Sequence, residues 1–183
     1  MKDLNNYGFN TSKLFYTVAE IGINHGGDED LAKKLIDSAA RAGADSVKFQ
    51  TYITEKRVPS DSPIFDILKQ CELPFEVFEE LKKYAEGKGV EFFSTPFDDE
   101  SVQCLEDIGV NLYKVASFDV VNHKLLRRIA KTGKTIIMSV GMANLPEIKD
   151  AYKILKEKTD RIAILHCVSA YPTNEKDANL FVI

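Results

Sequence analysis

Polar side chains of the kinds that enzymes use stand where short apolar runs of the sequence end. They are acids, amides, lysines, a histidine and hydroxyls: Glu20, Lys48, Gln50, Ser94, Thr95, Lys114, Ser117, Ser139, His166, Ser169 and Tyr171. A lysine within an apolar run is costly to bury unless it meets an anion. Two lysines with several hydroxyls would suit a phosphate and a carboxylate, so we expect a small anionic substrate. The alternative is that both lysines simply reach solvent.

Spacing refines this expectation for some residues and leaves it open for others. Lys48 and Gln50 are two residues apart, which predicts that they share one face of a strand. Glu20 could take part in chemistry or only neutralise a neighbouring lysine, and spacing does not choose between these roles. Cys167 lacks an evident base partner, so we do not expect a thiol nucleophile. The dispersed histidines form no recognisable metal motif.

Short β-rich runs alternate with longer amphipathic stretches along the chain. The strands that we expect are 15–21, 46–50, 91–95, 112–117, 135–139 and 161–167. The helices that we expect are 28–43, 64–88 with a break at Pro74, 98–109, 123–133 and 146–158. In the first helix, Leu31, Leu35 and Ala39 are expected to lie on one face, at i, i+4 spacing.

Six strands alternating with helices predict parallel βαβ units. A doubly wound sheet and a (β/α)8 barrel both give this pattern. The polar residues follow almost every strand, and in a barrel all strand ends converge on one mouth, where active sites of such enzymes lie. The pattern therefore favours an α/β fold of the TIM-barrel type, with about six strands in this chain.

Composition excludes several classes of function. The 183 residues carry 28 acidic and 24 basic side chains, for a net charge of −4, so neither nucleic acid nor a membrane surface is expected as a partner. The three cysteines are scattered, which argues against a disulfide framework. No apolar leader or membrane span is evident, so we expect a cytoplasmic protein.

Six segments together resemble the sialic acid synthase family: AEIGINHGG, AGADSVKFQT, FFSTPFD, YKVASFD, KTGKTIIMSVGMA and HCVSAYPTNEKDANL. The match runs in order from about Thr17 to the last residue. The resemblance implies a (β/α)8 barrel that condenses phosphoenolpyruvate with an N-acetylated mannose-type sugar, giving a nonulosonic acid and phosphate. It also implies a divalent metal, Mn2+ or else Mg2+, and a homodimer in the full-length form.

The resemblance also implies roles for residues of this chain. The positions that bind phosphoenolpyruvate are Lys48, Thr95, Lys114, Ser117, Ser139 and Ser169. Those near the sugar are Glu20, Gln50, Asp119 and Tyr171. Glu20 and Lys114 are expected to be catalytic, Glu20 by handling protons and Lys114 by stabilising charge. Phe118 and Val140 depart from the residues most common in the family. Phe118 and Asp119 should alter the sugar side of the pocket, but they do not identify the sugar.

The chain ends before the family's last two strands, which carry the metal-binding histidines, and before its antifreeze-like domain. We therefore expect residues 1–183 to form one partial barrel domain that contributes no metal ligand of its own. Two other functions stay open. The chain could be a non-catalytic binding or assembly subunit, or it could be a Schiff-base aldolase, since such enzymes share the barrel and use a strand lysine.

Overall fold

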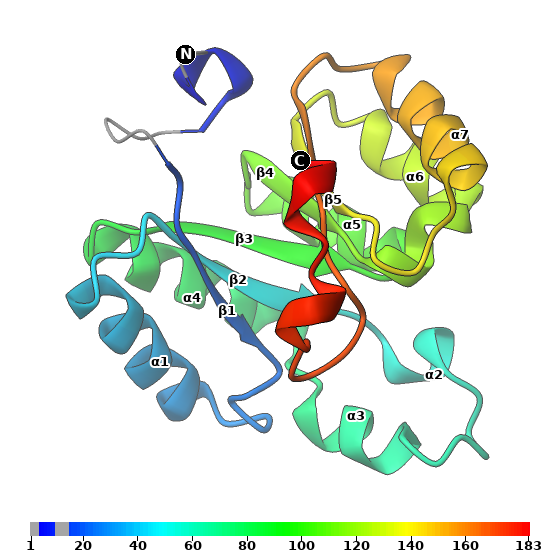
Figure 1. Cartoon of the computed structure of the whole chain (residues 1–183). Helices are drawn as coiled ribbons and strands as arrows, with labels where there is room; N and C mark the ends of the chain where they lie inside the picture. The colour runs from blue at the N-terminus through cyan, green and yellow to red at the C-terminus, as the bar shows by residue number, and fades with distance from the viewer. Residues whose placement is uncertain (1–3, 10–14) are drawn as a thin grey trace. The chain divides into compact units, whose positions relative to one another are not determined.

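The computed structural model describes residues 4–9 and 15–183 (Figure 1). The chain divides into two compact units, Met1–Asn111 and Leu112–Ile183. Each unit alternates parallel strands with helices.

The first unit contains three parallel strands in the order β1-β2-β3. Its elements are a 3-10 turn η1 (Leu4–Tyr7), β1 (Val18–Gly22), α1 (Glu29–Arg41), β2 (Ser46–Thr51), α2 (Thr54–Arg57), α3 (Phe65–Cys71), α4 (Phe75–Gly87), β3 (Glu91–Pro96) and α5 (Asp99–Asp107). Helices α1 and α4 pack against each other, α1 on β1 and β2 and α4 on β3 (Figure 1).

The second unit repeats the arrangement with strands in the order β4-β5-β6, again parallel. Its elements are β4 (Leu112–Val115), a 3-10 segment η2 (Ser117–Val121), α6 (His123–Ala130), β5 (Thr135–Ser139), α7 (Leu145–Lys156), β6 (Ile162–Leu165) and the short 3-10 turns η3 (Glu175–Asp177) and η4 (Leu180–Val182). Helices α6 and α7 lie side by side (Figure 1).

All six expected strands form, and the differences from the sequence expectation are local. The four-residue helix α2 was not expected, and the fourth strand ends at Val115, where η2 takes over. In α1 the buried residues are Ala32, Ile36 and Ala39, so of the three residues expected to share a face only Ala39 is buried. Leu31 lies in the first turn and is 38% exposed, because the helix turns the next residue, Ala32, toward the strands instead.

Alternation of side chains gives the strands of the first unit two different faces. Val47, Phe49 and Phe92 are buried on one face, and the rings of Phe49 and Phe92 stack with centroids 5.2 Å apart. The other face carries Lys48 on β2, between the apolar neighbours of the same strand. A hydrophobic layer thus fixes the register of β2, and that register sets where the lysine lies.

The turn between β1 and α1 is fixed by a close backbone contact. Gly27 has φ +83°, and a Cβ atom added to it would collide with the carbonyl oxygen of Gln70 in α3. Glycine is therefore required here for two reasons, conformation and space. The contact ties the loop that follows Glu20 to α3.

Gly27→Ala should destabilise the protein by about 1–3 kcal/mol more than Gly43→Ala does. Gly43 has a similar φ of +79° but nothing within 4 Å of an added Cβ, so it reports the conformational cost alone. That cost is about 1–2 kcal/mol. Urea unfolding of the two variants measures the difference, and equal losses of stability would show that the Gln70 contact does not constrain the turn.

Candidate active site at the strand ends

The ammonium group of Lys48 is the centre of a polar cluster in the first unit. Its Nζ lies 2.7 Å from Oε1 of Glu20 on β1 and donates a hydrogen bond of 2.9 Å to Oγ1 of Thr95 on β3. Glu20 is directly opposite Lys48 in the β1–β2 register, and Thr95 is opposite Gln50 in the β2–β3 register. Three neighbouring strands therefore bring together residues that are 75 positions apart at most in the sequence.

Lys48 is buried, whereas its acidic partner faces solvent. Lys48 is only 5% exposed, but 60% of the Glu20 side chain is accessible. Burial holds the pKa of Lys48 below its ordinary value, and the positive charge of Arg57 lowers it further, while the charge and the hydrogen bond of Glu20 oppose both. The result is a buried positive charge whose negative partner is largely accessible to solvent, which suits the binding of an anion.

Gln50 extends the cluster toward the loop that follows β2. Its Oε1 accepts a 2.9 Å hydrogen bond from Nη1 of Arg57, the last residue of α2. Its Nε2 and Oε1 of Glu20 both approach Gly22, at 3.6 and 3.5 Å from the position of an added Cβ. Gln50 and Glu20 thus flank one glycine. The sequence did not point to Arg57, because no helix, strand or site residue was expected between residues 50 and 64.

Helix α2 is held in place from two sides. The backbone N–H of Ile53, just before α2, donates to Oδ2 of Asp98 at 3.0 Å, and Oδ1 of Asp98 accepts from the N–H of Ser101 at the start of α5. The N–H of Thr54 donates to Glu72 at 2.8 Å. The carboxylate of Asp98 therefore caps α5 and also anchors the residue before α2, which fixes the position of the first turn of α2.

In the second unit, Lys114 and Ser139 lie on the same face of neighbouring strands. The β4–β5 register places Lys114 opposite Ile137, two residues before Ser139. The Nζ of Lys114 donates to the carbonyl oxygen of Val115 at 2.7 Å. Since Lys48 belongs to the first unit, the expectation that the two lysines share one cradle stays a prediction.

The remaining expected residues of the second unit lie in different surroundings. Ser117 begins η2, and Asp119 within it is buried and accepts a 3.1 Å hydrogen bond from Nδ2 of Asn122. Phe118 is 48% exposed on the same segment. Tyr171 is fully exposed. The structure therefore brings Lys114 and Ser139 to one face, whereas Tyr171 stands in solvent.

Gly141 allows two chain segments of the second unit to approach closely. A Cβ at this position would be 2.7 Å from the carbonyl oxygen of Cys167 and 3.1 Å from Oγ of Ser169. A groove of about 830 Å³ runs beside this contact and is lined by β6 and the start of α7 among other segments, with Val140, Gly141, His166 and Cys167 in its wall. Ser169 is thus placed at the end of β5, near Gly141.

The thiol of Cys167 is electrostatically unlike that of Cys104. Burial raises the pKa of Cys167, but hydrogen bonds with the Ser139 side chain and with the backbone of Val140 and Gly141, together with the charge of Lys114, outweigh it and hold the pKa below its ordinary value. For Cys104, burial raises the pKa to about 11.

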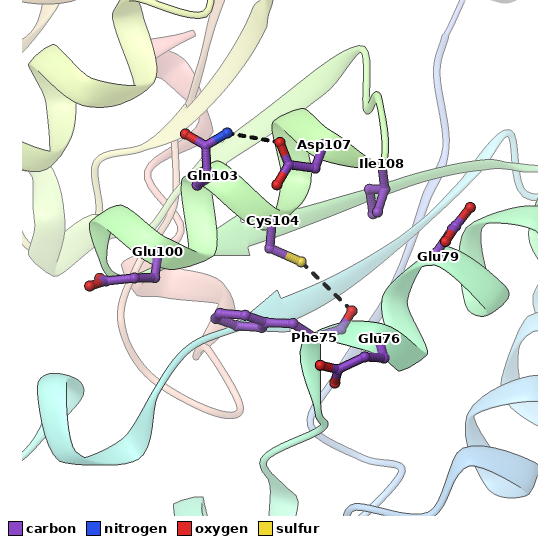
Figure 2. A pocket seen from close by; sticks show the side chains of 8 residues that line it. All are labelled: Phe75, Glu76, Glu79, Glu100, Gln103, Cys104, Asp107 and Ile108. Atoms are coloured by element: carbon purple, nitrogen blue, oxygen red, sulfur yellow. Dashed lines mark hydrogen bonds between the residues drawn. The ribbon is translucent and has the colours of Figure 1, made fainter.

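Cys104 lines a separate cavity between α4 and α5 (Figure 2). This cavity of about 390 Å³ has a rim of carboxylates, and its lining residues are Phe75, Glu76, Glu79, Glu100, Gln103, Cys104, Asp107 and Ile108. The thiol donates to the carbonyl oxygen of Phe75 and Gln103 donates to Asp107, as Figure 2 shows. None of the residues expected in the active site lines it, so this cavity is not part of the candidate site.

Comparison with known proteins decides the family. The model of the NeuB family matches residues 35–183, which is most of the chain. The chain belongs to the NeuB family. The resemblance seen in the sequence is thereby confirmed.

The relatives of this NeuB-family chain include one uncharacterised protein and several proteins named as synthases. An uncharacterised protein of Methanocaldococcus jannaschii is 44% identical over 92% of this chain and 50% of its own length. The N,N'-diacetyllegionaminic acid synthase of Campylobacter jejuni is 39% identical over 89% of this chain and 54% of its own. Other relatives are named pseudaminic acid synthase and N-acetylneuraminate-9-phosphate synthase. The chain spans about half the length of the curated relatives it matches.

A solved structure confirms the fold class. The N-acetylneuraminic acid (sialic acid) synthetase of Leptospira borgpetersenii, in complex with citrate, superposes with a TM-score of 0.88 at 42% identity. The match covers 92% of this chain and 60% of that one. The NeuB-family chain is therefore an α/β protein with six parallel strands of a TIM-type barrel, as expected.

Two further properties concern the described part of the chain. No three His, Cys, Asp or Glu side chains among residues 4–9 and 15–183 come together as a group that could hold a metal ion. No helix within the same residues is long and apolar enough to cross a membrane.

Lys48→Met should raise the free energy of unfolding by about 1 kcal/mol, because methionine fills a similar volume without a buried charge and Glu20 stays solvated. The folded-state pKa of Lys48 is lowered. At pH values between that pKa and the ordinary value of 10.5, Lys48 holds its proton in the unfolded wild type but has lost it in the folded one. The free energy of unfolding of the wild type therefore increases as the pH rises through this window. The advantage of the variant should therefore be largest below this window and shrink toward pH 10.5. Urea unfolding at several pH values measures it, and a less stable variant would contradict the stated cost of Lys48.

Cys167 should react with iodoacetamide at pH 7 at least about tenfold faster than Cys104, since the thiolate is the reactive form. Ser139→Ala should slow the reaction of Cys167 by removing a hydrogen bond and leave Cys104 unchanged. Mass spectrometry of the alkylated peptides gives both rates, and the unfolded chain serves as the control in which the difference disappears. Equal rates in the folded protein would refute the electrostatic contrast between the two thiols.

Proposed function

We propose that this NeuB-family chain binds phosphoenolpyruvate and forms the phosphoenolpyruvate-binding part of a nonulosonic acid synthase, which condenses that substrate with an N-acetylated mannose-type sugar. The observation that carries the proposal is the buried Lys48, hydrogen-bonded to Thr95 and paired with the accessible carboxylate of Glu20. The names of the relatives support the reaction class. Which sugar is used is left to the experiment.

Phosphoenolpyruvate carries a carboxylate and a phosphate, and Lys48 supplies a desolvated positive charge for one of them. A bound anion can replace Glu20 as the negative partner of Lys48, and this releases Glu20 from the ion pair. Thr95 fixes the position of the ammonium group by accepting a hydrogen bond from one of its three N–H groups. The family resemblance assigns the rest of the substrate to residues of the second unit, and this assignment stays a prediction: Lys114, Ser117, Ser139 and Ser169.

The reaction joins C3 of phosphoenolpyruvate to the aldehyde carbon of the open-chain sugar. The aldehyde oxygen takes up a proton and becomes a hydroxyl. Water adds at C2, and phosphate leaves with cleavage of the C2–O bond, which produces the 2-keto acid. Glu20, once released from Lys48, is placed to give or take the protons of these steps. Lys48 and Lys114 stabilise the developing negative charge.

The chain's described residues do not fit a divalent metal site, as no suitable group of ligands comes together. We therefore derive no step of the reaction through a metal ion. The Mn2+ requirement implied by the family resemblance stays a prediction, and activity with and without added Mn2+ tests it. The homodimer and the cytoplasmic location stay predictions in the same way.

Lys48→Met should weaken phosphoenolpyruvate binding at least about tenfold while the protein stays folded, because the variant lacks the charged hydrogen-bond donor. Isothermal titration calorimetry on the 183-residue chain measures this, with Arg41→Met as a control that removes an exposed charge on α1. Phosphate release with Mn2+ and a panel of N-acetylated mannose-type sugars then identifies the acceptor.

Four results would count against the proposal in whole or in part. Unchanged binding in Lys48→Met would exclude the lysine from the site. No binding by the wild type would exclude a phosphoenolpyruvate site in this chain. A covalent adduct trapped by borohydride with pyruvate on Lys48 or Lys114 would instead favour a Schiff-base aldolase. Binding without phosphate release for any sugar would favour a binding subunit.

A further inference from the structure

Arg57 has an unusually constrained side chain for a residue in the loop after a strand. Its guanidinium carbon lies 3.8 Å from the ring centre of Phe97 and 4.6 Å from that of Tyr52. The two rings are nearly perpendicular, with centroids 6.1 Å apart. A cation held over two aromatic faces is stabilised electrostatically and loses much of its rotational freedom.

The two rings are themselves fixed. Tyr52 directly follows β2, is 2% exposed, and its hydroxyl donates to the carbonyl oxygen of Leu68 in α3 at 2.8 Å. Phe97 follows β3, and its backbone N–H donates to the carbonyl oxygen of Thr51 at 3.1 Å. The support under Arg57 is therefore built from residues of two neighbouring strand ends.

The fixed guanidinium group in turn orients one side chain of the candidate site. Nη1 of Arg57 donates to Oε1 of Gln50 at 2.9 Å. An amide whose oxygen is held in this way must direct its NH2 group away from Arg57, and Nε2 indeed lies on the side of Gly22 and Glu20. Without Arg57 the two ends of the amide could exchange places by rotation about the last side-chain bond.

We propose that Arg57 is a positioning residue that acts through Gln50: it holds the Gln50 amide so that its two N–H groups face the acceptor-sugar side of the site. The inference rests on the proposed function for the identity of the acceptor. An oriented amide donor recognises a carbonyl or hydroxyl oxygen of the sugar, whereas phosphoenolpyruvate is held by Lys48. Loss of Arg57 should therefore weaken sugar binding more than anion binding, which loses only the contribution of the Arg57 charge near Lys48.

Arg57→Met retains most of the apolar stem and removes the donor, and Arg41→Met is the matched control on the surface of α1. We expect the affinity for N-acetylmannosamine to fall about tenfold in Arg57→Met, as for the loss of one well-placed hydrogen bond. The affinity for phosphoenolpyruvate should fall by less than this, because only the charge of Arg57 near Lys48 is lost and no hydrogen bond to the anion. Calorimetry with each ligand gives both values, and thermal unfolding verifies that the variant is folded.

A double-mutant cycle tests whether Arg57 acts through Gln50. Gln50→Leu should reproduce the loss of sugar affinity, and adding Arg57→Met to it should cause no further loss. Independent, multiplying losses would overturn the proposal. So would an equal weakening of both ligands in Arg57→Met, because that outcome indicates general damage to the site.

NMR provides a readout that needs no ligand. In the wild type the side-chain amide signals of Gln50, assigned by their loss in Gln50→Leu, should show the relaxation of an ordered group, and in Arg57→Met that of a mobile one. The Gln103 amide, which donates to Asp107 in its own helix, is the internal reference. If the wild type binds neither ligand, the proposed function has failed, and this signal alone supports or overturns the positioning role.

Discussion

The burial of a charged side chain, Lys48, within a hydrophobic strand is the constraint on which the candidate site of the first unit depends. Its neighbours Val47 and Phe49 are fully buried, so the strand cannot shift by one residue without exposing both and moving the lysine into the apolar layer. A buried ammonium group needs partners, and the register of three strands supplies Glu20 on one side and Thr95 on the other. Hydrophobic burial thus fixes the position of a charge that it does not itself stabilise.

A second polar pair shows what a purely structural arrangement on the same sheet looks like. Tyr16, just before β1, donates a 2.6 Å hydrogen bond to Glu91, the first residue of β3, at the amino end of the strands. Burial raises the pKa of both groups. Burial therefore disfavours the ionised form of each group, and the hydrogen bond between the two side chains is retained. The Lys48–Glu20 pair differs because its acid is mostly exposed, so the ion pair can open.

The sequence was sufficient for the features that depend on local alternation. Apolar runs predicted all six strands, and two-residue spacing predicted that Lys48 and Gln50 share a face. Helix α1 was predicted in extent, but spacing does not tell which of its faces is buried, because Leu31 and Ala32 both suit a buried position and only the packing of the helix decides. The role of Arg57 was not predictable for a different reason. A four-residue helix has no periodicity, and the partner Phe97 is 40 positions away in the sequence.

The loop after β3 therefore has a larger influence on the site than its own polar residues suggest. The ring of Phe97 packs against the guanidinium group of Arg57. The next residue, Asp98, anchors the start of α2 and caps α5. Both residues are buried, at 9% exposure, and neither has a group aimed at the Lys48 cluster. Because Arg57 ends a helix of one turn whose start is tied to Asp98, a movement of this loop would move the guanidinium group and with it the Gln50 amide. Such a movement acts directly on Gln50, whose amide is hydrogen-bonded to Arg57, and less on Lys48, whose direct partners Glu20 and Thr95 lie on the strands. Differences in acceptor preference within such a scaffold can then arise from loop residues that never touch the sugar.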